Sequence, residues 1–230
     1  MSGLDGNFVE LRMWRVAKVG PALLRMASGR FGLRATPGLR FAKLLGTGSG
    51  RTFTPRDADL HHWALLSVWD GDESADEFGG GRLVRSWEAA SEEHLRVRMT
   101  PLSARGQWAG AQPFQASDQV GHCGPVAAIT RARLRPARAL SFWRAVPPVV
   151  TALSTAPGLR LAVGIGEAPV GLQGTFSLWE SGQHLIDFAY RDAAHRAAVQ
   201  QTEPARWYAE ELFARFAVHE VEGTYRGRMP

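Results

Sequence analysis

Apolar and polar residues follow one another along the chain in an order that predicts the same series of elements twice. Apolar residues at every second position, or in short runs bounded by Gly, Pro and Asp, are typical of strands, and steps of three or four are typical of helices. The first half predicts strand, helix, strand, strand, helix, strand over FVELRMWRV, PALLRMAS, GLRFAKLLG, HHWALLSVW, SADEFGGGRLVRSWEAASEEHL and RVRMTPLSA. The second half predicts the same order over PVAAITRARL, RALSFWRAVPPVVTAL, GLRLAVGIG, GTFSLW, a long helix at 182–212 broken near Pro204, and ARFAVHEV.

The two halves also match in sequence. TPGLRFAKLLGTG (36–48) resembles APGLRLAVGIGEA (156–168), and WALLSVWDGDESADEF (63–78) resembles QGTFSLWESGQHLIDF (173–188). In each half a tryptophan is followed nine residues later by a phenylalanine. These matches predict an internal repeat.

The order βαββαβ is that of the ferredoxin-like unit, whose sheet carries both helices on one face. The sequence therefore predicts an α+β fold in which two tandem ferredoxin-like βαββαβ repeats pack sheet to sheet as an intrachain dimeric α/β barrel. We expect an N-terminal repeat over 1–110, a linker over 111–123 and a C-terminal repeat over 124–230. The loop at 47–60 is longer than its counterpart EAPVGL, which makes it a candidate lid. We expect Pro147 and Pro148 to end or kink the first helix of the second repeat.

Composition narrows the classes of function. The chain has 230 residues, 45% of them hydrophobic, and 27 Lys and Arg against 22 Asp and Glu. The arginines are spread along the chain, which disfavours nucleic-acid binding but allows contact with an anionic membrane surface. We expect a soluble cytoplasmic protein that contacts membranes only peripherally, because neither a signal peptide nor an apolar run of 18 residues is present. Cys123 is the only cysteine, which excludes an internal disulfide, a cysteine-based zinc site and covalent haem attachment.

Two short motifs carry little chemistry. GTGSG at 46–50 lacks the residues of a phosphate-binding loop and precedes a strand, so we interpret it as a flexible loop. His61 and His62 are adjacent in a predicted strand and therefore point to opposite faces, so they cannot bind one metal together. A metal site with several protein ligands is thus not indicated.

His195 is the one histidine with a suggestive neighbourhood. On a continuous helix it shares a face with Leu185, Phe188, Asp192 and Val199, and the alanines around it leave room for a flat group. A haem iron needs only one axial imidazole from the protein, and Asp192 would orient the ring. The residues alone leave a second interpretation open, in which His195 is an ordinary surface or packed residue.

Several ordered blocks over roughly residues 35–220 resemble the spheroidene monooxygenase family, the acyclic carotenoid ketolases. The blocks are TPGLRFAKLLGTGSGRTFTPR (36–56), WALLSVW (63–69), PLSARGQW (101–108), GPVAAITRARLRP (124–136), FWRAVP (142–147), IGEAPVGLQGTFSLW (165–179), FAYRDAAHRAAV (188–199) and WYAEELFARF (207–216).

This resemblance implies an oxygen-dependent enzyme with non-covalent haem b. Such an enzyme hydroxylates a methylene of an acyclic carotenoid, and a second hydroxylation with loss of water gives a ketone. The electrons come from an external donor such as ferredoxin, because no flavin or nicotinamide motif is present. Haem-binding members of the dimeric α/β barrel superfamily hold the iron through a histidine on a helix of the C-terminal copy. The resemblance thus implies that His195 is the metal ligand.

The remaining site residues are predicted from their places on the strands of the second repeat. Thr175 and Arg131 are the candidate catalytic residues, expected on the inner surface of the second sheet. Phe188, Gly164 and Gly166 are expected to contact the cofactor together with His195, the glycines by letting a flat ring approach the backbone. Three alternatives stay open: another haem enzyme of this fold, such as an aldoxime dehydratase, a cofactor-free barrel oxygenase, and a binding module without turnover. Edge strands make a homodimer plausible.

Overall fold

The computed structural model describes residues 7–49, 55–117, 121–167, 172–192, 196–197, 200 and 205–230. The first half contains β1 (Phe8–Val16), α1 (Val19–Leu33), β2 (Leu39–Gly48), the 3-10 turn η1 (Pro55–Asp57), β3 (Ala58–Trp69), α2 (Asp72–Gly79), α3 (Arg82–Glu88) and β4 (Ser91–Gly106). The second half contains β5 (Val126–Leu134), η2 (Pro136–Arg138), α4 (Ala139–Ser154), β6 (Leu159–Gly166), β7 (Leu172–Trp179), α5 (Gly182–Arg191) and β8 (Tyr208–Gly223).

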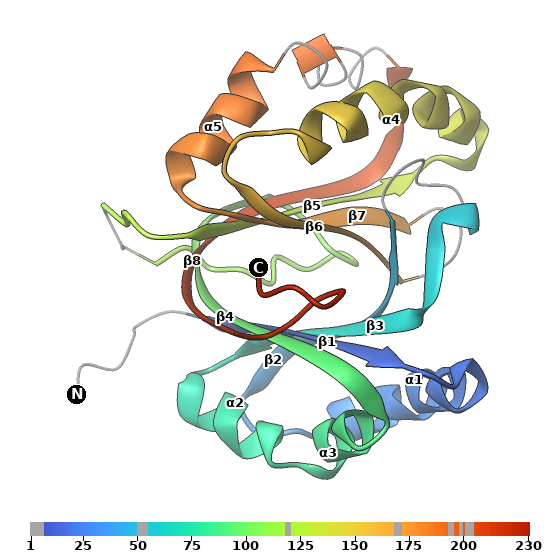
Figure 1. The fold of residues 1–230 in the computed structure, drawn as a ribbon, viewed down its shortest axis with the longest axis vertical. Helices are drawn as coiled ribbons and strands as arrows, with labels where there is room; N and C mark the ends of the chain where they lie inside the picture. The colour runs from blue at the N-terminus through green and yellow to red at the C-terminus, as the bar shows by residue number, and fades with distance from the viewer. Residues whose placement is uncertain are drawn as a thin grey trace.

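The strands form one closed antiparallel barrel in the order β1-β3-β2-β6-β7-β5-β8-β4. Each half contributes four neighbouring strands, and the halves meet along β2 with β6 and along β4 with β8. Figure 1 shows the resulting layers: α1, α2 and α3 lie below the strands of the first half, and α4 and α5 lie above those of the second. The fold is therefore α+β, with helices on the outer faces of a closed sheet.

Apolar side chains fill the inside of the barrel because alternate residues of every strand point inward. Trp108 and Phe114, from the chain that follows β4, add their rings to this core, and Tyr225 adds its ring from the chain that follows β8. The inward-pointing core residues include Leu11, Leu66, Val97, Ile129, Val163, Phe176 and Phe216. The described interior is thus a packed core.

The repeated sequences form matching contacts in the two halves. The indole N–H of Trp69 donates to Ser67 Oγ at 2.9 Å, and that of Trp179 donates to Ser177 Oγ at 3.0 Å. The ring of Trp69 lies 4.9 Å from that of Phe78, and the ring of Trp179 lies 5.4 Å from that of Phe188. In each half, the contact between the tryptophan and the phenylalanine nine residues later therefore packs a helix on the end of a strand.

Three sequence-based element predictions need correction. The predicted long helix at 182–212 is wrong over its last part, because Tyr208–Gly223 is strand β8. That predicted helix also breaks earlier than Pro204, because Asp192 has extended dihedrals while its carbonyl accepts from Arg196 N–H at 3.0 Å. The helix α4 continues through Pro147 and Pro148 instead of ending there. No helix in the described part of the chain is long and apolar enough to span a membrane.

Candidate functional site

The sheet surface that faces α4 and α5 carries mostly small side chains. Residues of β5, β6 and β7 alternate between the core and this outer face, so the neighbours of Ile129, Val163 and Phe176 point toward the helices. We call these outward residues the small-residue face: Ala128, Thr130, Ala132, Ala162, Gly164, Thr175 and Ser177. Thr175 pairs with Thr130 on one side and Gly164 on the other, so these three residues form a row across the sheet.

The same surface of the first half is filled by large side chains. Two equivalent strand pairs show which positions of the two halves correspond. Phe8 at the start of β1 pairs with Trp69 at the end of β3, and Val126 at the start of β5 pairs with Trp179 at the end of β7. Counting from these pairs, the row Thr130, Thr175 and Gly164 corresponds to the row Arg12, Leu65 and Leu44. The neighbouring position is Trp14 in the first half and Ala132 in the second.

Those large residues close the space under the helices of the first half. Trp14 stacks on Trp87 of α3 with ring centroids 5.3 Å apart, and Arg12 Nε donates to Glu10 Oε1 at 2.6 Å. Leu65 is fully buried in the same layer. The second half lacks this bulk at the corresponding positions Thr130, Thr175 and Gly164.

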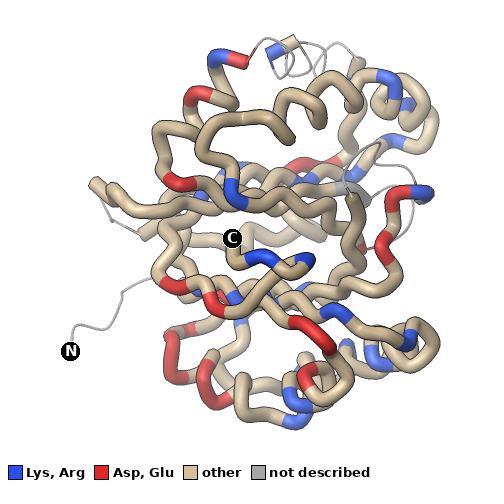
Figure 2. The backbone as a smooth tube through the Cα atoms, in the orientation of Figure 1, with Lys and Arg blue, Asp and Glu red and all other residues tan. Residues whose placement is uncertain are grey.

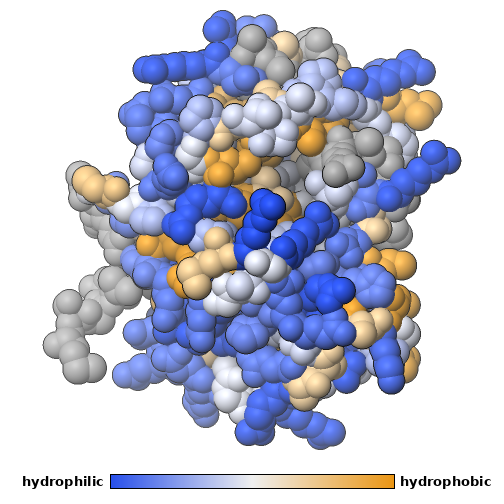
Figure 3. Space-filling model, viewed as in Figure 1, coloured by the Kyte–Doolittle hydropathy of each residue, from blue (hydrophilic) through white to orange (hydrophobic). Residues whose placement is uncertain are grey.

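The helices of the second half contact the sheet at both of its ends, and Val146 in the middle of α4 is buried as well. At one end Leu185 and Phe188 of α5 pack on Trp179. At the other end Phe142 of α4 packs on Trp207, whose indole N–H donates to Ser141 Oγ at 3.0 Å. Between them Thr130 is exposed, although its strand is paired on both sides. Figure 3 shows apolar atoms at the surface in the upper part of the molecule, between α4 and the strands below it.

One buried donor of the second helix layer lacks a partner. The indole Nε1 of Trp143 on α4 is buried and has no hydrogen-bond partner among the described residues. Buried indole N–H groups usually find an acceptor. Trp143 adjoins Phe142, which packs at the Trp207 end of the small-residue face. The free donor is what a polar group of a bound molecule would satisfy.

The predicted cofactor residues are only partly placed. Thr175 and Gly164 lie side by side on the small-residue face. Gly166 lies at the junction of the halves, where it pairs with Gly46 of β2. Phe188 lies against Trp179. The prediction that Phe188 and Asp192 share one face of a continuous helix is wrong, because α5 ends at Arg191. His195 lies outside the described residues, so its role as a ligand stays a prediction.

Arg131 lies on the opposite face from Thr175 and points into the barrel, where its side chain is 5% exposed. Its guanidinium bonds to Glu210, lies 3.4 Å from Glu167 Oε1 and stands over the ring of Trp108 at 5.4 Å. Two residues on opposite faces of one sheet cannot serve one surface of a cofactor. The expectation that both act on the inner surface of the second sheet therefore does not fit the geometry.

The sequence analysis missed the partners of Arg131. Lys43 Nζ on β2 donates to Glu167 Oε2 at 2.7 Å, and the indole N–H of Trp108 donates to the other oxygen of that carboxylate. Burial raises the pKa of Glu210, but hydrogen bonds from Arg131 and from the N–H groups of Gly110 and Ala109 outweigh it, so the pKa lies below its ordinary value. This network joins β2, β5 and β8 to the segment that follows β6, which is a structural role.

A second polar cluster anchors the C-terminal segment to the barrel mouth. His62 Nδ1 lies 2.8 Å from Asp59 Oδ2, and the ring of His62 stands 5.0 Å from that of Tyr225. Glu93 accepts from Thr224 Oγ1 at 2.8 Å and from Gly227 N–H at 2.6 Å. His62 is buried while His61 is exposed, as their adjacent places in a strand predict. Among the described residues no group of His, Cys, Asp and Glu is arranged to hold a metal ion.

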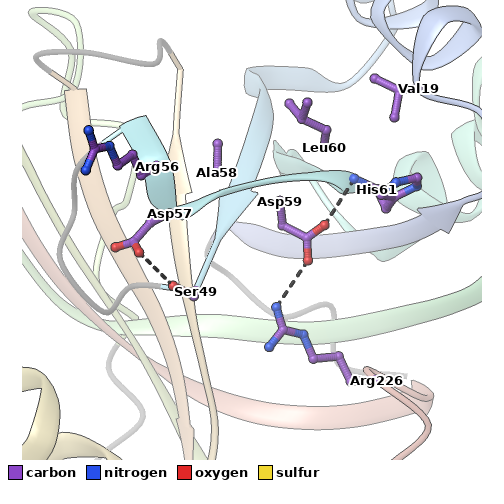
Figure 4. A pocket seen from close by; sticks show the side chains of 9 residues that line it. All are labelled: Val19, Ser49, Arg56, Asp57, Ala58, Asp59, Leu60, His61 and Arg226. Atoms are coloured by element: carbon purple, nitrogen blue, oxygen red, sulfur yellow. Dashed lines mark hydrogen bonds and ion pairs between the residues drawn. The ribbon is translucent and has the colours of Figure 1, made fainter.

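The predicted lid borders a shallow polar pocket of about 440 Å³ (Figure 4). Asp57 accepts from Ser49 Oγ at 3.0 Å, and Asp59 accepts from Arg226 at 3.1 Å and from His61 N–H at 3.0 Å. These carboxylates are therefore paired within the protein, while His61, which also lines the pocket, has its Nδ1 2.8 Å from the Val16 carbonyl oxygen. The part of the lid at 50–54 lies outside the described residues.

Comparisons with known proteins identify close sequence relatives, although no family model matches the chain. The chain is 38% identical to spheroidene monooxygenase of Rubrivivax gelatinosus over 216 residues, which covers 91% of this chain and 82% of that protein. It is 35% identical to spheroidene monooxygenase of Rhodobacter capsulatus over 210 residues, which covers 90% and 86%.

Solved structures agree on the fold. A crystal structure of an aldoxime dehydratase in complex with butyraldoxime superposes with a TM-score of 0.63 over 96% of this chain and 84% of that one, at 11% identity. A second aldoxime dehydratase structure superposes with a TM-score of 0.57 at 8% identity, covering 93% and 81%. At this level of identity the likeness establishes the fold alone.

Proposed function

Because the chain belongs to the spheroidene monooxygenase family, we propose that it is a haem b-dependent monooxygenase that hydroxylates an acyclic carotenoid. One oxygen atom of O2 becomes the hydroxyl group on a methylene carbon, and the other leaves as water with two electrons and two protons. A second hydroxylation at the same carbon, followed by loss of water, gives the ketone. The electrons come from a small redox protein such as ferredoxin.

The observation that carries the proposal is the small-residue face. Thr130, Thr175 and Gly164 stand where the first half has Arg12, Leu65 and Leu44, so this face offers a planar macrocycle less steric obstruction than the first half does. Gly164 lets the ring approach the backbone. The residues present therefore fit haem, with His195 proposed as the axial ligand.

Haem supplies the activation of O2 when it is bound. The chain's own residues position the reactants. The hydroxyl of Thr175 is proposed to donate a hydrogen bond on the oxygen-binding side, since Ser177 already accepts from Trp179. The aromatic contacts of Phe188 with Trp179 and of Phe142 with Trp207 exclude water at both ends of the face. An apolar polyene would then lie along a surface that is shielded at both ends.

The element order and the matching Trp contacts support a further architectural proposal. Two tandem ferredoxin-like repeats, at 1–110 and 124–230, form the two halves of the barrel, with a connection at 111–123. Phe114 in this connection is buried in the core, so the connection is part of the fold and not a free tether. In this proposal only the C-terminal repeat keeps the space for a cofactor.

The alternatives have less support. A cofactor-free barrel oxygenase needs a cavity inside the barrel, whereas the described interior is packed with apolar side chains. An aldoxime dehydratase shares the fold, but sequence identity of 11% carries no statement about chemistry. The family relationship at 38% identity therefore decides in favour of the oxygenase.

The proposal is tested by reconstituting the purified protein with haem and recording its absorbance. We expect a Soret band with a 1:1 stoichiometry, and a changed axial-ligand spectrum in His195→Ala with the same circular dichroism. An unchanged ligand spectrum in that variant would remove His195 from the site. Incubation with an acyclic carotenoid, reduced ferredoxin and O2 should give hydroxylated and keto products, and binding without turnover would leave only a haem-binding module.

A further inference from the structure

The outer face of α1 exposes large apolar side chains, and the Arg34 guanidinium stands 5.6 Å from the centre of the Phe31 ring. Leu23 is 51% exposed, Leu24 is 73% exposed and Phe31 is 72% exposed. Leu24 and Phe31 are seven residues apart, which places them on the same side of the helix, two turns from each other. Figure 3 shows apolar atoms at the lower right of the molecule, where α1 lies in Figure 1.

The other side of α1 is firmly attached to the protein. Ala22 is fully buried, and Met26 and Leu33 pack against the Trp14 and Trp87 cluster. Arg25 Nε donates to Ser86 Oγ of α3 at 3.1 Å. The exposed side chains are therefore held in place on a helix that already has its core contacts.

The charged residues of α1 and of the sequence that flanks it are all positive. Asp57 and Asp59 lie near its first residue, Val19, around a shallow pocket. The sequence contains no Asp or Glu between Glu10 and Asp57. The cations beside the apolar side chains are Lys18, Arg30 and Arg34 of α1 and its flanks, with Arg82 and Arg85 on the neighbouring α3. The one acidic residue of α3, Glu88, lies 3.3 Å from Arg12. Figure 2 shows Lys and Arg over α1, whereas Asp and Glu gather on α2 at the lower left.

We propose that α1 docks the protein on an anionic lipid surface, with Leu23, Leu24 and Phe31 inserted at the boundary between headgroups and acyl chains. A helix with apolar residues on its outer side and cations beside them binds to such a surface with its apolar side chains partly inserted. A stable protein interface buries about 800 Å² on each partner, whereas this patch is three side chains on one helix. The lipid surface therefore fits better than a second copy of the chain.

The test is flotation with vesicles of phosphatidylcholine alone and of phosphatidylcholine with phosphatidylglycerol. We expect binding to the anionic vesicles only, reduced at least tenfold in Leu24→Ser/Phe31→Ser. In Arg30→Gln/Arg34→Gln we expect a loss of roughly fivefold for each cation, and weaker binding at high salt. The matched control Leu140→Ser removes a leucine that is 68% exposed on α4, and it should bind as the unaltered protein does.

A second measurement locates the contact without a substitution. Hydrogen exchange of residues 19–33 should slow when anionic vesicles are added, with α4 unchanged. Equal binding by Leu24→Ser/Phe31→Ser, or equal loss in Leu140→Ser, overturns the proposal. So does a dimer in the absence of lipid that the Leu24→Ser/Phe31→Ser variant abolishes, because the helix would then bind a second copy.

Discussion

Replacing Arg131 by methionine separates a structural role from a catalytic one. The Arg131 side chain is 5% exposed and bonds to Glu210, whose side chain is 12% exposed. Breaking a buried ion pair by removing one partner costs about 3–5 kcal/mol because the other charge stays buried. Glu210 keeps the N–H groups of Ala109 and Gly110 at 3.0 and 2.9 Å, and Glu167 keeps Lys43 at 2.7 Å. We therefore expect the lower end of that range, a loss of about 3 kcal/mol in the free energy of unfolding.

The assay is urea unfolding followed by tryptophan fluorescence. Thr130→Val is the matched control, because Thr130 adjoins Arg131 in sequence but points to the other face, and it should cost less than about 1 kcal/mol. Arg131→Met/Glu210→Gln should recover part of the loss, since no unpaired charge then remains at Glu210. A loss below about 1 kcal/mol in Arg131→Met, accompanied by a changed haem spectrum, would refute the structural role and return Arg131 to the cofactor.

The remaining predictions concern pH, backbone and packing. Hydrogen bonds hold the pKa of Glu210 and of Glu93 below the ordinary value of about 4.3. The two carboxylates therefore stabilise the folded protein fully above that pH, and this stabilisation disappears as the pH falls through their pKa values in the folded state. Because Glu93→Gln removes one of these contributions, its acid unfolding should begin at higher pH. Gly106→Ala should lower the free energy of unfolding by at least about 2 kcal/mol, because φ is +90° and the new Cβ would lie 2.1 Å from the Glu211 carbonyl oxygen. Gly110→Ala, at φ +76° with no heavy atom near the new Cβ, should lower it by about 1 kcal/mol. Equal losses of stability in thermal unfolding of the two variants would contradict this difference. Leu65→Thr should cost about 2–4 kcal/mol in urea unfolding because Leu65 is fully buried, whereas an effect near zero would show that the first helix layer is loosely packed.

The order of elements could be predicted from the sequence, because most strands and helices here have clear periods and the matching sequences of the two halves predict the same order twice. The first part of β8, residues 208–212, was mistaken for helix because Glu210 occupies an inward position among apolar residues, where it pairs with Arg131. A charged residue at an inward position breaks the alternation that marks a strand. Lys43 and Arg131 are also charged residues at inward strand positions, and this pattern in the sequence could have indicated the buried network that was missed.

The candidate site needed the structure for a different reason. Alternation shows that Thr130 and Arg131 point to opposite faces, but barrel closure decides which face is the core. The internal sequence repeat already aligns Thr175 with Leu65 and Gly164 with Leu44. Only the strand pairs place these residues in one row with Thr130, which corresponds to Arg12 of the first half. The interruption at Asp192 could not be predicted from FAYRDAAHRAAV, which contains neither Gly nor Pro.

Haem titration of Thr175→Leu tests the central claim most directly. This substitution gives the second half the side chain that the first half has at Leu65, and the space under the helices should close. We predict that the Soret band of the variant requires at least a tenfold higher haem concentration, while Leu65→Thr binds haem as the unaltered protein does despite its lower stability. Equal haem affinity in Thr175→Leu and the unaltered protein would mean that haem, if bound, lies elsewhere.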